Sequence, residues 1–269
     1  MFTENLKQIQ RMAPLMQRVL IVDPAPASAR LLADLMRNIA NVQLWHAPTT
    51  RKGLEAARQV NPQLIFVELS GTDVDGVQFS RQLRRSHAAC RMAPIIMVTA
   101  TATAAAILAA RDAGVHEFLR KPYTTKDLLR RLEAVTLHPR DWIEAVGYVG
   151  PDRRRFNSGE YAGPQKRKAD KPATAAAAAL AVKDQALRIL AASLAQFDSD
   201  PMQALRAVKQ QAETLKSLAM KTSDTRLAVA AAGLEGCLAS GAPTKAGLAG
   251  PIGAILALAE PGTELARAG

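Results

Sequence analysis

The sequence predicts an α/β domain with a five-stranded, parallel, doubly wound sheet over residues 17–138, followed by an all-α helical bundle over residues 173–260. Three observations support this prediction. In the first half, short apolar runs alternate with helix-patterned segments, which is typical of a parallel sheet covered by helices on both faces. In the second half, Leu and Ala recur at helical spacing without strand signals. Between the halves, turn formers and basic residues follow no period.

The five predicted strands are the apolar runs of the first half. They are Arg18–Val22, Val42–Trp45, Leu64–Leu69, Pro94–Thr99 and Glu117–Leu119. The segments between them carry helical spacing, as in Leu31, Leu32, Leu35 and Met36 or in Leu128, Leu129 and Leu132. We expect residues 1–16 to form a helical extension in front of the first strand.

The second half shows three clear helical stripes and a weaker fourth one, so four helices with short connections are expected to form a bundle. Asp198-Ser199-Asp200-Pro201 predicts one helix start, because a capping side chain precedes a Pro in the first turn. Residues 139–172 are predicted to be a basic linker and residues 261–269 a tail.

The bulk composition fits a globular protein of two domains. The chain has 269 residues, 48% of them hydrophobic and 22% charged, which is enough for two domains of about 100–150 residues. Cys90 and Cys237 lie far apart without a C-x-x-C spacing, so we expect reduced thiols and a cytoplasmic location. No apolar window approaches about 18 residues, so no membrane insertion is expected.

The net charge of +11 raises the question of an anionic partner. The most concentrated basic stretch is residues 152–171, with seven Lys and Arg against three Asp and Glu. Elsewhere the positive charge is spread thinly, which is more typical of a basic surface than of a nucleic-acid groove. Duplex DNA is disfavoured as a partner because no recognition helix with base-reading side chains stands out.

Polar side chains follow the ends of the predicted strands in a distinctive order. They are Asp23, then Glu68 with Asp75-Gly76 behind it, then Thr99, Phe118 and Lys121-Pro122. Taken together, residues 17–135 resemble the receiver domain of two-component response regulators, which has a flavodoxin-like, CheY-like fold. The resemblance implies that Glu68 stands at the phosphoacceptor position and Asp23 at an acidic metal position. It also implies that Thr99 and Phe118 form the switch pair and that Lys121 binds phosphate, with a cis peptide before Pro122.

Two positions depart from the pattern of that family. Glu stands at position 68 where the family has Asp, and Pro24 replaces the second of two adjacent acids. Mg²⁺ takes oxygen ligands in near-octahedral geometry, so we expect weak or absent Mg²⁺ binding, no other cofactor and no enzymatic activity. Glu68 could imitate a phosphorylated aspartate by engaging Thr99 and Lys121, could be inert, or could still accept phosphate slowly.

The helical half contains a second resemblance, around Glu213 and Ser217. This segment is similar to a histidine phosphotransfer domain in which Glu213 stands at the position of the phosphorylated His. All four histidines of the chain precede residue 140, so no His can carry phosphate in the bundle. An alternative interpretation of the same helix is an ordinary charged, solvated face.

These features favour an atypical response regulator that acts by binding bacterial signalling proteins, such as histidine kinases, receivers or phosphotransfer proteins. A homodimer is also compatible with the sequence. A second hypothesis is a sensor in which Arg153, Arg154 and Arg155 clamp an anionic nucleotide such as a cyclic dinucleotide, since Arg binds phosphates bidentately. A hydrolase using the carboxylates of Asp23 and Glu68 receives little support, because no other hydrolase motif occurs.

Overall fold

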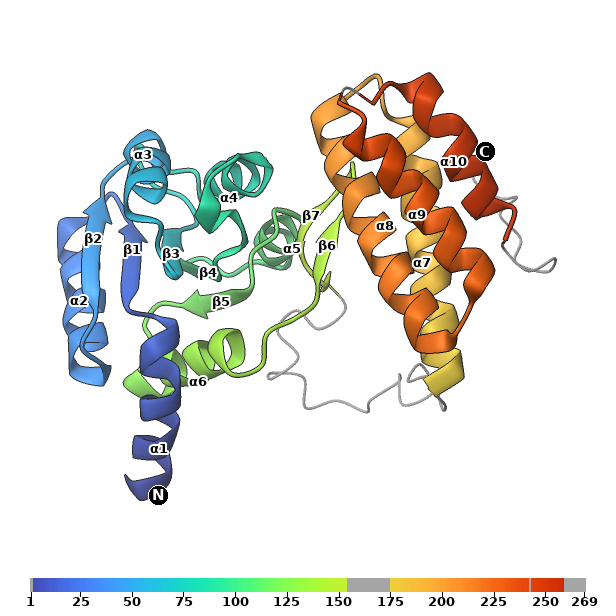
Figure 1. Cartoon of the computed structure of the whole chain (residues 1–269). Coiled ribbons are helices and arrows are strands. Elements are labelled where there is room, and N and C mark those ends of the chain that lie inside the picture. Colours follow the sequence, from blue (N-terminus) through green and yellow to red (C-terminus); the bar gives the residue numbers. More distant parts are fainter. Residues whose placement is uncertain (1, 154–174, 242, 259–269) are drawn as a thin grey trace. The chain divides into compact units, whose positions relative to one another are not determined.

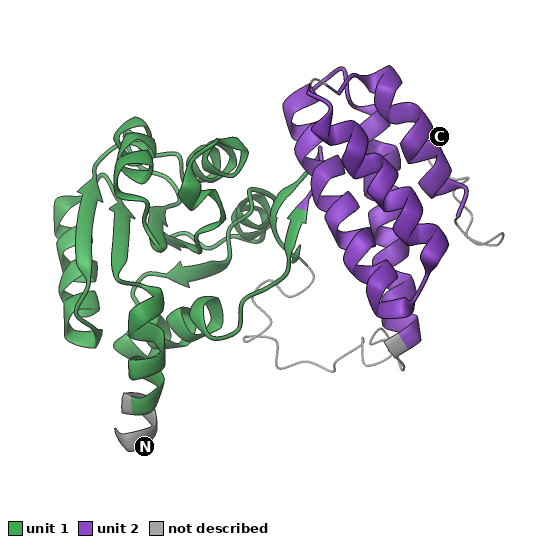
Figure 2. Ribbon diagram, viewed as in Figure 1, with its two compact units in different colours: residues 1–143, 148–161 green, residues 144–147, 162–269 purple. Residues whose placement is uncertain are grey.

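The computed structural model describes residues 2–153, 175–241 and 243–258. The chain divides into two compact units, of which the first covers residues 1–143 and 148–161 and the second covers residues 144–147 and 162–269 (Figure 2). Each unit has its own hydrophobic core.

A parallel sheet of five strands organises the first unit (Figure 1). The strand order is β2-β1-β3-β4-β5, with all neighbouring pairs parallel. This confirms the predicted doubly wound α/β fold. The strands are β1 (Arg18–Val22), β2 (Gln43–Ala47), β3 (Leu64–Glu68), β4 (Ile95–Thr99) and β5 (Glu117–Arg120).

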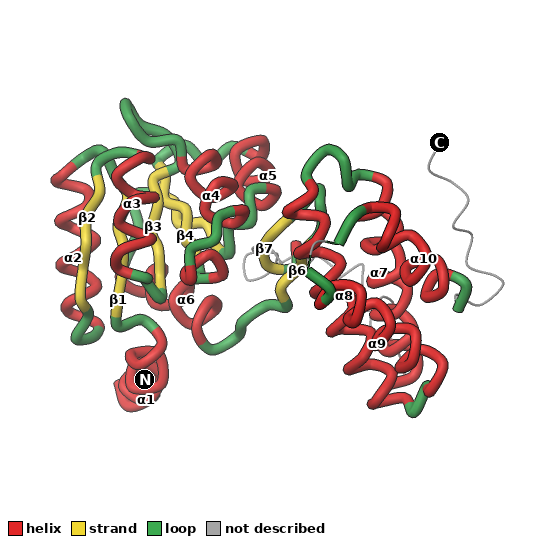
Figure 3. The backbone as a smooth tube through the Cα atoms, turned by 45° about the horizontal axis from the view of Figure 1, so that its top comes forward, coloured by secondary structure: helices red, strands yellow, loops and turns green. Residues whose placement is uncertain are grey.

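Helices cover both faces of this sheet (Figure 3). Because side chains alternate along a strand, odd and even positions of β1 enter different cores: Val19 and Ile21 pack in one, Leu20 and Val22 in the other. The first core also contains residues of α2 and α6, and the second contains residues of α3, α4 and α5. These helices are α2 (Pro26–Ile39), α3 (Thr50–Val60), α4 (Gly76–Arg85), α5 (Ala104–Asp112) and α6 (Thr125–Thr136).

The predicted N-terminal helix is present as α1 (Phe2–Met12), followed by the short helix η1 (Ala13–Leu15). It does more than precede the domain. Met12 and Met16 are fully buried in the core on the α2 and α6 face. The side-chain amide of Gln8 donates to the carboxylate of Glu133 in α6 at 3.1 Å. The segment is therefore packed onto the sheet domain along its C-terminal part.

The prediction of a linker from residue 139 onward misses a small β structure. Residues Trp142–Glu144 form β6 and Val149–Pro151 form β7, a separate two-stranded sheet. Val146, Tyr148 and Val149 are buried. The sequence pattern hid these strands because each has only three residues, too few to show alternation, in a stretch rich in Gly and Pro.

The second unit is a bundle of helices, as predicted. It consists of α7 (Ala175–Ala195), α8 (Pro201–Thr222), α9 (Thr225–Ala239) and α10 (Lys245–Leu256). Asp200 caps α8 by accepting from the backbone N–H of Gln203 at 3.1 Å, which confirms the predicted start. Leu190, Leu215, Leu234 and Ile252, one from each helix, are fully buried in a common core.

Across the parts of the chain that the structure describes, none of the helices combines the length and the apolar character needed to cross a membrane.

Candidate functional site

The ammonium group of Lys121 lies in a cluster of oxygen atoms at the carboxyl end of the five-stranded sheet. It donates to Glu68 Oε2 at 2.6 Å, to Ser28 Oγ at 2.7 Å and to Asp23 Oδ2 at 3.3 Å. An ammonium group has three N–H donors, so all of them have acceptors. The structure thus brings together Asp23, Glu68 and Lys121, as the sequence predicts.

Each member of the cluster is positioned by the end of a strand or the start of a helix. Glu68 is the last residue of β3, and Asp23 and Lys121 directly follow β1 and β5. The carboxyl ends of parallel strands meet at one edge of the sheet, where open α/β sheets place their ligand sites. Asp23 is held further, because its Oδ1 accepts from the amide of Ala25 at 2.8 Å.

Sequence reasoning missed Ser28 as a member of this cluster. It lies in the first turn of α2, and its hydroxyl accepts one hydrogen bond from Lys121. The only signal in the sequence is its place five residues after Asp23, and a Ser near a helix start is common for unrelated reasons. Such a contact depends on tertiary packing and could not be predicted from spacing.

Glu68 and Lys121 shift each other's pKa, and burial acts on both. Burial raises the pKa of Glu68, and the hydrogen bond and charge of Lys121 only partly offset this effect. Burial alone would lower the pKa of Lys121, but the hydrogen bond and charge of Glu68 and the charge of Asp23 outweigh it, so the Lys121 pKa is raised. The asymmetry follows from exposure, since 9% of the Glu68 side chain is exposed against 25% for Lys121.

The cluster offers little to a divalent metal ion. Its acidic donors are the carboxylates of Asp23 and Glu68, both of which contact the Lys121 ammonium. Among the residues with described positions, no group of three or more His, Cys, Asp and Glu side chains is arranged to hold a metal ion. Mg²⁺ requires near-octahedral oxygen ligation, and a cation already occupies the space between the two carboxylates. The donor set therefore fits Mg²⁺ poorly.

Pro24 has a structural role at the position where the resemblance implies a second acid. A Cβ atom built on Gly71, in the loop after β3, would lie 2.4 Å from Cγ of Pro24. The ring of Pro24 therefore packs directly against the backbone of this loop. Proline offers no side-chain ligand, so this position contributes contact surface only.

The predicted switch residues lie on adjacent strands. Thr99 ends β4 and is buried, and its hydroxyl accepts from the amide of Thr101 at 3.1 Å. The alternative in which Glu68 engages both Thr99 and Lys121 is met for Lys121 and stays a prediction for the Thr99 hydroxyl. The Thr99 carbonyl accepts from the Lys121 amide at 2.7 Å. Phe118 of β5 is also buried. The Lys121–Pro122 peptide is cis, as expected.

The remaining predicted site residues are engaged elsewhere or are exposed. Arg153 donates to Asp112 at 3.1 Å, and its guanidinium lies 4.4 Å from the ring centre of Tyr148. Arg154 and Arg155 lie outside the described residues, so the anion clamp stays a prediction. Glu213 is exposed on α8, and the partly buried Ser217 lies one turn further along the helix.

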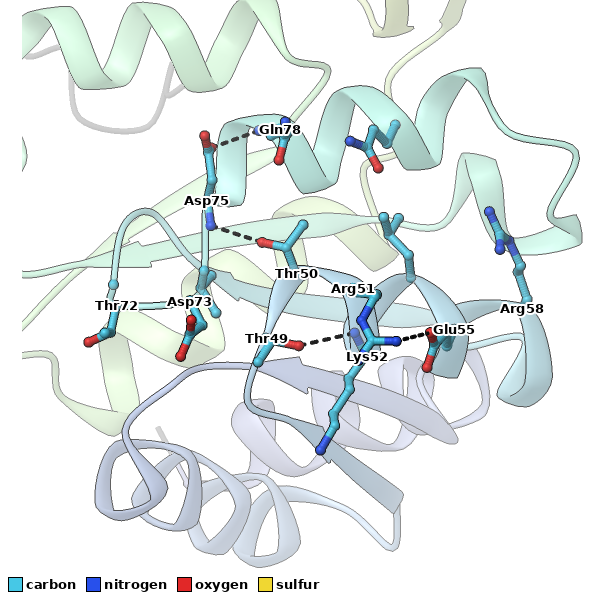
Figure 4. Close-up of a pocket in the computed structure, with 14 residues that line it drawn as sticks. Thr49, Thr50, Arg51, Lys52, Glu55, Arg58, Thr72, Asp73, Asp75 and Gln78 are labelled. Carbon is cyan, nitrogen blue, oxygen red and sulfur yellow. Dashed lines mark hydrogen bonds and ion pairs between the residues drawn. The ribbon is translucent and has the colours of Figure 1, made fainter.

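A groove of about 780 Å³ lies between α3, α4 and the loop that follows β3 (Figure 4). The Thr50 hydroxyl accepts from the Asp75 amide at 2.9 Å, and Thr49 and Asp75 cap α3 and α4 respectively. These hydrogen bonds attach the start of α3 to the loop behind Glu68. The lining carries both signs of charge, with Arg51 paired to Glu55 at 3.5 Å.

Comparison with known proteins identifies the first half of the chain. Residues 19–133 match the model of the response regulator receiver domain. The KDP operon transcriptional regulatory protein KdpE of Escherichia coli K12 is 33% identical over 117 residues, which are 44% of this chain and 50% of that protein. The DNA-binding dual master transcriptional regulator RpaA of a Synechocystis strain is 30% identical over 120 residues, 45% of this chain and 49% of that protein. The first unit thus contains a receiver domain of the kind used in two-component signalling.

The chain spans about half the length of the curated relatives that it matches. Among solved structures, the chemotaxis protein CheY4 of Vibrio cholerae aligns with a TM-score of 0.42 and 21% identity, covering 45% of this chain and 98% of that one. A two-component response regulator from Clostridium difficile aligns with a TM-score of 0.42 and 20% identity, covering 46% and 99%.

Proposed function

We propose that this chain is an atypical response regulator whose receiver domain acts by binding other signalling proteins, with its phosphoryl chemistry weakened or lost. The observation that carries the proposal is the position of the Lys121 ammonium, 2.6 Å from Glu68 and 3.3 Å from Asp23. The pocket formed by these residues thereby has part of its negative charge offset by one of its own side chains. It does not depend on a metal ion or a phosphoryl group to hold its charges together.

Phosphoryl transfer needs a cation that neutralises the charge developing on the transferred group. Here Lys121 has its three donors engaged by oxygen atoms of the protein, so it must leave Glu68 before it can bind a phosphoryl oxygen. Breaking a short hydrogen bond between charged groups costs about 1.5–3 kcal/mol. That cost is added to the barrier of any transfer onto Glu68.

The side chain of Glu68 adds a geometric obstacle. One methylene more than in Asp displaces the carboxylate by roughly 1 Å, a misplacement that can reduce a reaction rate about 100-fold. The chain is therefore proposed to have no enzymatic activity of its own. Its signalling partners are proposed to be histidine kinases, other receivers or phosphotransfer proteins, bound through the receiver or through the exposed Glu213 side of α8.

Incubation with acetyl phosphate and Mg²⁺ tests the loss of phosphoryl chemistry directly. The expected result is an unchanged intact mass after incubation, because neither the metal nor the acceptor geometry is in place. A receiver domain with a normal acceptor Asp is the positive control for the reagent. An adduct of one phosphoryl group that the Glu68→Gln variant lacks would contradict the proposal.

Introducing the family's acids at positions 24 and 68 tests the same proposal by attempting to restore metal binding. The Pro24→Asp and Glu68→Asp double variant is expected to bind Mg²⁺ at least about tenfold more tightly than the natural chain, a change of about 1.4 kcal/mol, because a third acid then joins the cluster. Calorimetric titration with Mg²⁺ measures this difference. The single variant Glu68→Asp, which keeps Pro24, is the matched control and should gain less. Equal Mg²⁺ affinity in the natural chain and the double variant would count against this account of the pocket.

A further inference from the structure

The chain that leaves the receiver after α6 folds back onto it. We call the part of the β6–β7 hairpin that belongs to the first unit the strap; it consists of residues 142–143 and 148–153. The family match ends at residue 133, so the strap is an addition to the receiver. Its packing partners are Arg84 of α4, Arg91 before β4 and Gly114 in the turn between α5 and β5.

The docking site of the strap is organised by Arg84, the largest fully buried side chain among the described residues, with 1% of its surface exposed. Its Nε donates to the carbonyl of Gly114 at 2.9 Å, and its Nη1 donates to the carbonyls of Arg91 at 2.6 Å and Ala93 at 2.9 Å. Its Nη2 faces Nδ1 of His116 at 3.2 Å. Within the described residues, this cation has no carboxylate partner.

Aromatic side chains of the strap complete the environment of this cation. The ring centre of Trp142 lies 5.2 Å from the guanidinium of Arg84 and 5.8 Å from that of Arg91, distances at which a cation and an aromatic face attract each other. Tyr148 is buried and donates to the carbonyl of Pro151 at 2.6 Å. Burial raises the pKa of Tyr148 to about 12, so its hydroxyl stays a donor.

Gly150 of the strap and Gly114 of the receiver allow the two backbones to pack in direct contact. A Cβ on Gly150 would lie 2.6 Å from Cα of Gly114, and a Cβ on Gly114 would lie 2.4 Å from the carbonyl oxygen of Val149. Both distances are shorter than real Cβ contacts allow. Gly147, in the turn of the same hairpin, has open space around its Cβ position.

The strap contacts the receiver near the start of β4 and β5, the two strands whose carboxyl ends lie at the pocket. His116 directly precedes β5, and its amide donates to the carbonyl of Ile95, the first residue of β4, at 2.9 Å. The His116 carbonyl accepts from Arg140, which also donates to the Asp152 carbonyl of the strap at 3.1 Å.

At the other end of the same strand pair, the Lys121 amide donates to the carbonyl of Thr99 at 2.7 Å. The two strands pair in register between these ends, from Ile96 opposite Glu117 to Thr99 opposite Arg120. The pocket end and the strap end are thus about 16 Å apart along one short strand.

We propose that the strap is the output element of this receiver: its docking on Arg84 and Gly114 depends on whether Lys121 is engaged by Glu68. The β4–β5 pair has no room to deform locally, because both strands are buried apart from Arg120 and both of their ends are hydrogen-bonded. A displacement of Lys121 by a partner is therefore passed to His116 and Gly114. The strap also flanks residues 144–147, which belong to the second unit.

A pair of glycine variants tests the docking. In a Trp45→Phe background, Trp142 is the only tryptophan, so its fluorescence reports the strap. We expect Gly150→Ala to expose Trp142, with a red-shifted emission and faster amide exchange over residues 148–151, while Gly147→Ala leaves both unchanged. Identical emission and exchange in the two variants would overturn the assignment of the docking site.

The coupling is tested by perturbing the pocket and measuring the strap. Lys121→Met is expected to raise amide exchange over residues 148–151 by about fivefold, the low end of measured allosteric couplings, with Lys126→Met on the exposed start of α6 as control. Glu68→Gln is a second, milder variant in case Lys121→Met disturbs folding. Exchange in β2, which carries no member of the Lys121 cluster, serves as the internal reference.

A rise confined to the strap and the start of β4 and β5 supports the proposal. Unchanged strap exchange in both pocket variants, or an equal rise in β2, overturns it. This outcome is independent of the acetyl phosphate experiment. A receiver that accepts phosphate can still be coupled to the strap, and a receiver that does not accept phosphate can lack this coupling.

Discussion

Replacing Arg84 by methionine is expected to lower the free energy of unfolding of the first unit by about 3–5 kcal/mol. Three carbonyl groups lose their donor, the buried one of Gly114 and the partly buried ones of Arg91 and Ala93, at about 1–3 kcal/mol for a fully buried group and less for the other two. Part of this loss in the free energy of unfolding is offset, because the variant no longer has to bury the charged guanidinium of Arg84. That opposition is visible in the folded protein, where burial lowers the pKa of Arg84 to about 9.

Denaturant unfolding followed by tryptophan fluorescence measures this effect on the correct unit, because both tryptophans, Trp45 and Trp142, belong to the first unit. Arg81→Met is the matched control. Arg81 lies on the same helix but is exposed, and exposed substitutions usually change stability by less than about 0.5 kcal/mol. Equal stability of the two variants would show that the hydrogen bonds from Arg84 to these three carbonyl groups contribute little to the stability of the first unit.

Acidification is expected to destabilise the same region through His116. Its Nδ1 faces two donors, the amide of Ile95 and the guanidinium of Arg84, both at 3.2 Å, so Nδ1 carries no proton and the imidazole is neutral. Burial, followed by the charges of Arg84 and Arg140, holds the pKa of His116 well below its usual value.

The sign of the effect follows from proton binding. The unfolded chain protonates this His below about pH 6.5, whereas the folded chain does not until a lower pH, so the unfolded state binds more protons in that window. The stability of the first unit should therefore fall by up to about 1.4 kcal/mol per pH unit as the pH drops below 6.5.

Unfolding titrations between pH 7.5 and roughly pH 5 measure this slope. The variant His116→Asn keeps an acceptor in a similar place but cannot take up a proton, so its stability should depend less on pH than that of the natural chain. His138→Asn is the control, because His138 is largely exposed. A pH dependence that survives in His116→Asn would assign the acid sensitivity to other groups.

The sequence alone predicts the sheet domain and the core of the pocket well. Buried strands of a parallel sheet appear as short apolar runs, and charged side chains mark the ends of three of them, so Asp23, Glu68 and Lys121 could be placed together from the sequence. The strand expected over Val42–Trp45 extends to Ala47, because an edge strand also carries polar residues such as His46 and is less apolar than its neighbours.

The strap and its docking site could not be predicted from the sequence. Arg84 follows the pattern of an ordinary exposed helix end, since it stands beside Arg81 and Arg85 in a basic stretch. Only the tertiary structure shows that its guanidinium is buried among carbonyl groups. Gly114 and Gly150 likewise look like common turn residues, because a backbone contact between distant segments leaves no periodic signal.

The contact between Pro24 and Gly71 restricts the order in which this pocket can change over generations. While the proline ring occupies the space beside the loop, any side chain at position 71 collides with it. A smaller or more flexible residue at position 24 removes that collision and makes position 71 open to variation. Substitution at position 24 by a smaller residue is thus a precondition for placing a side chain at position 71.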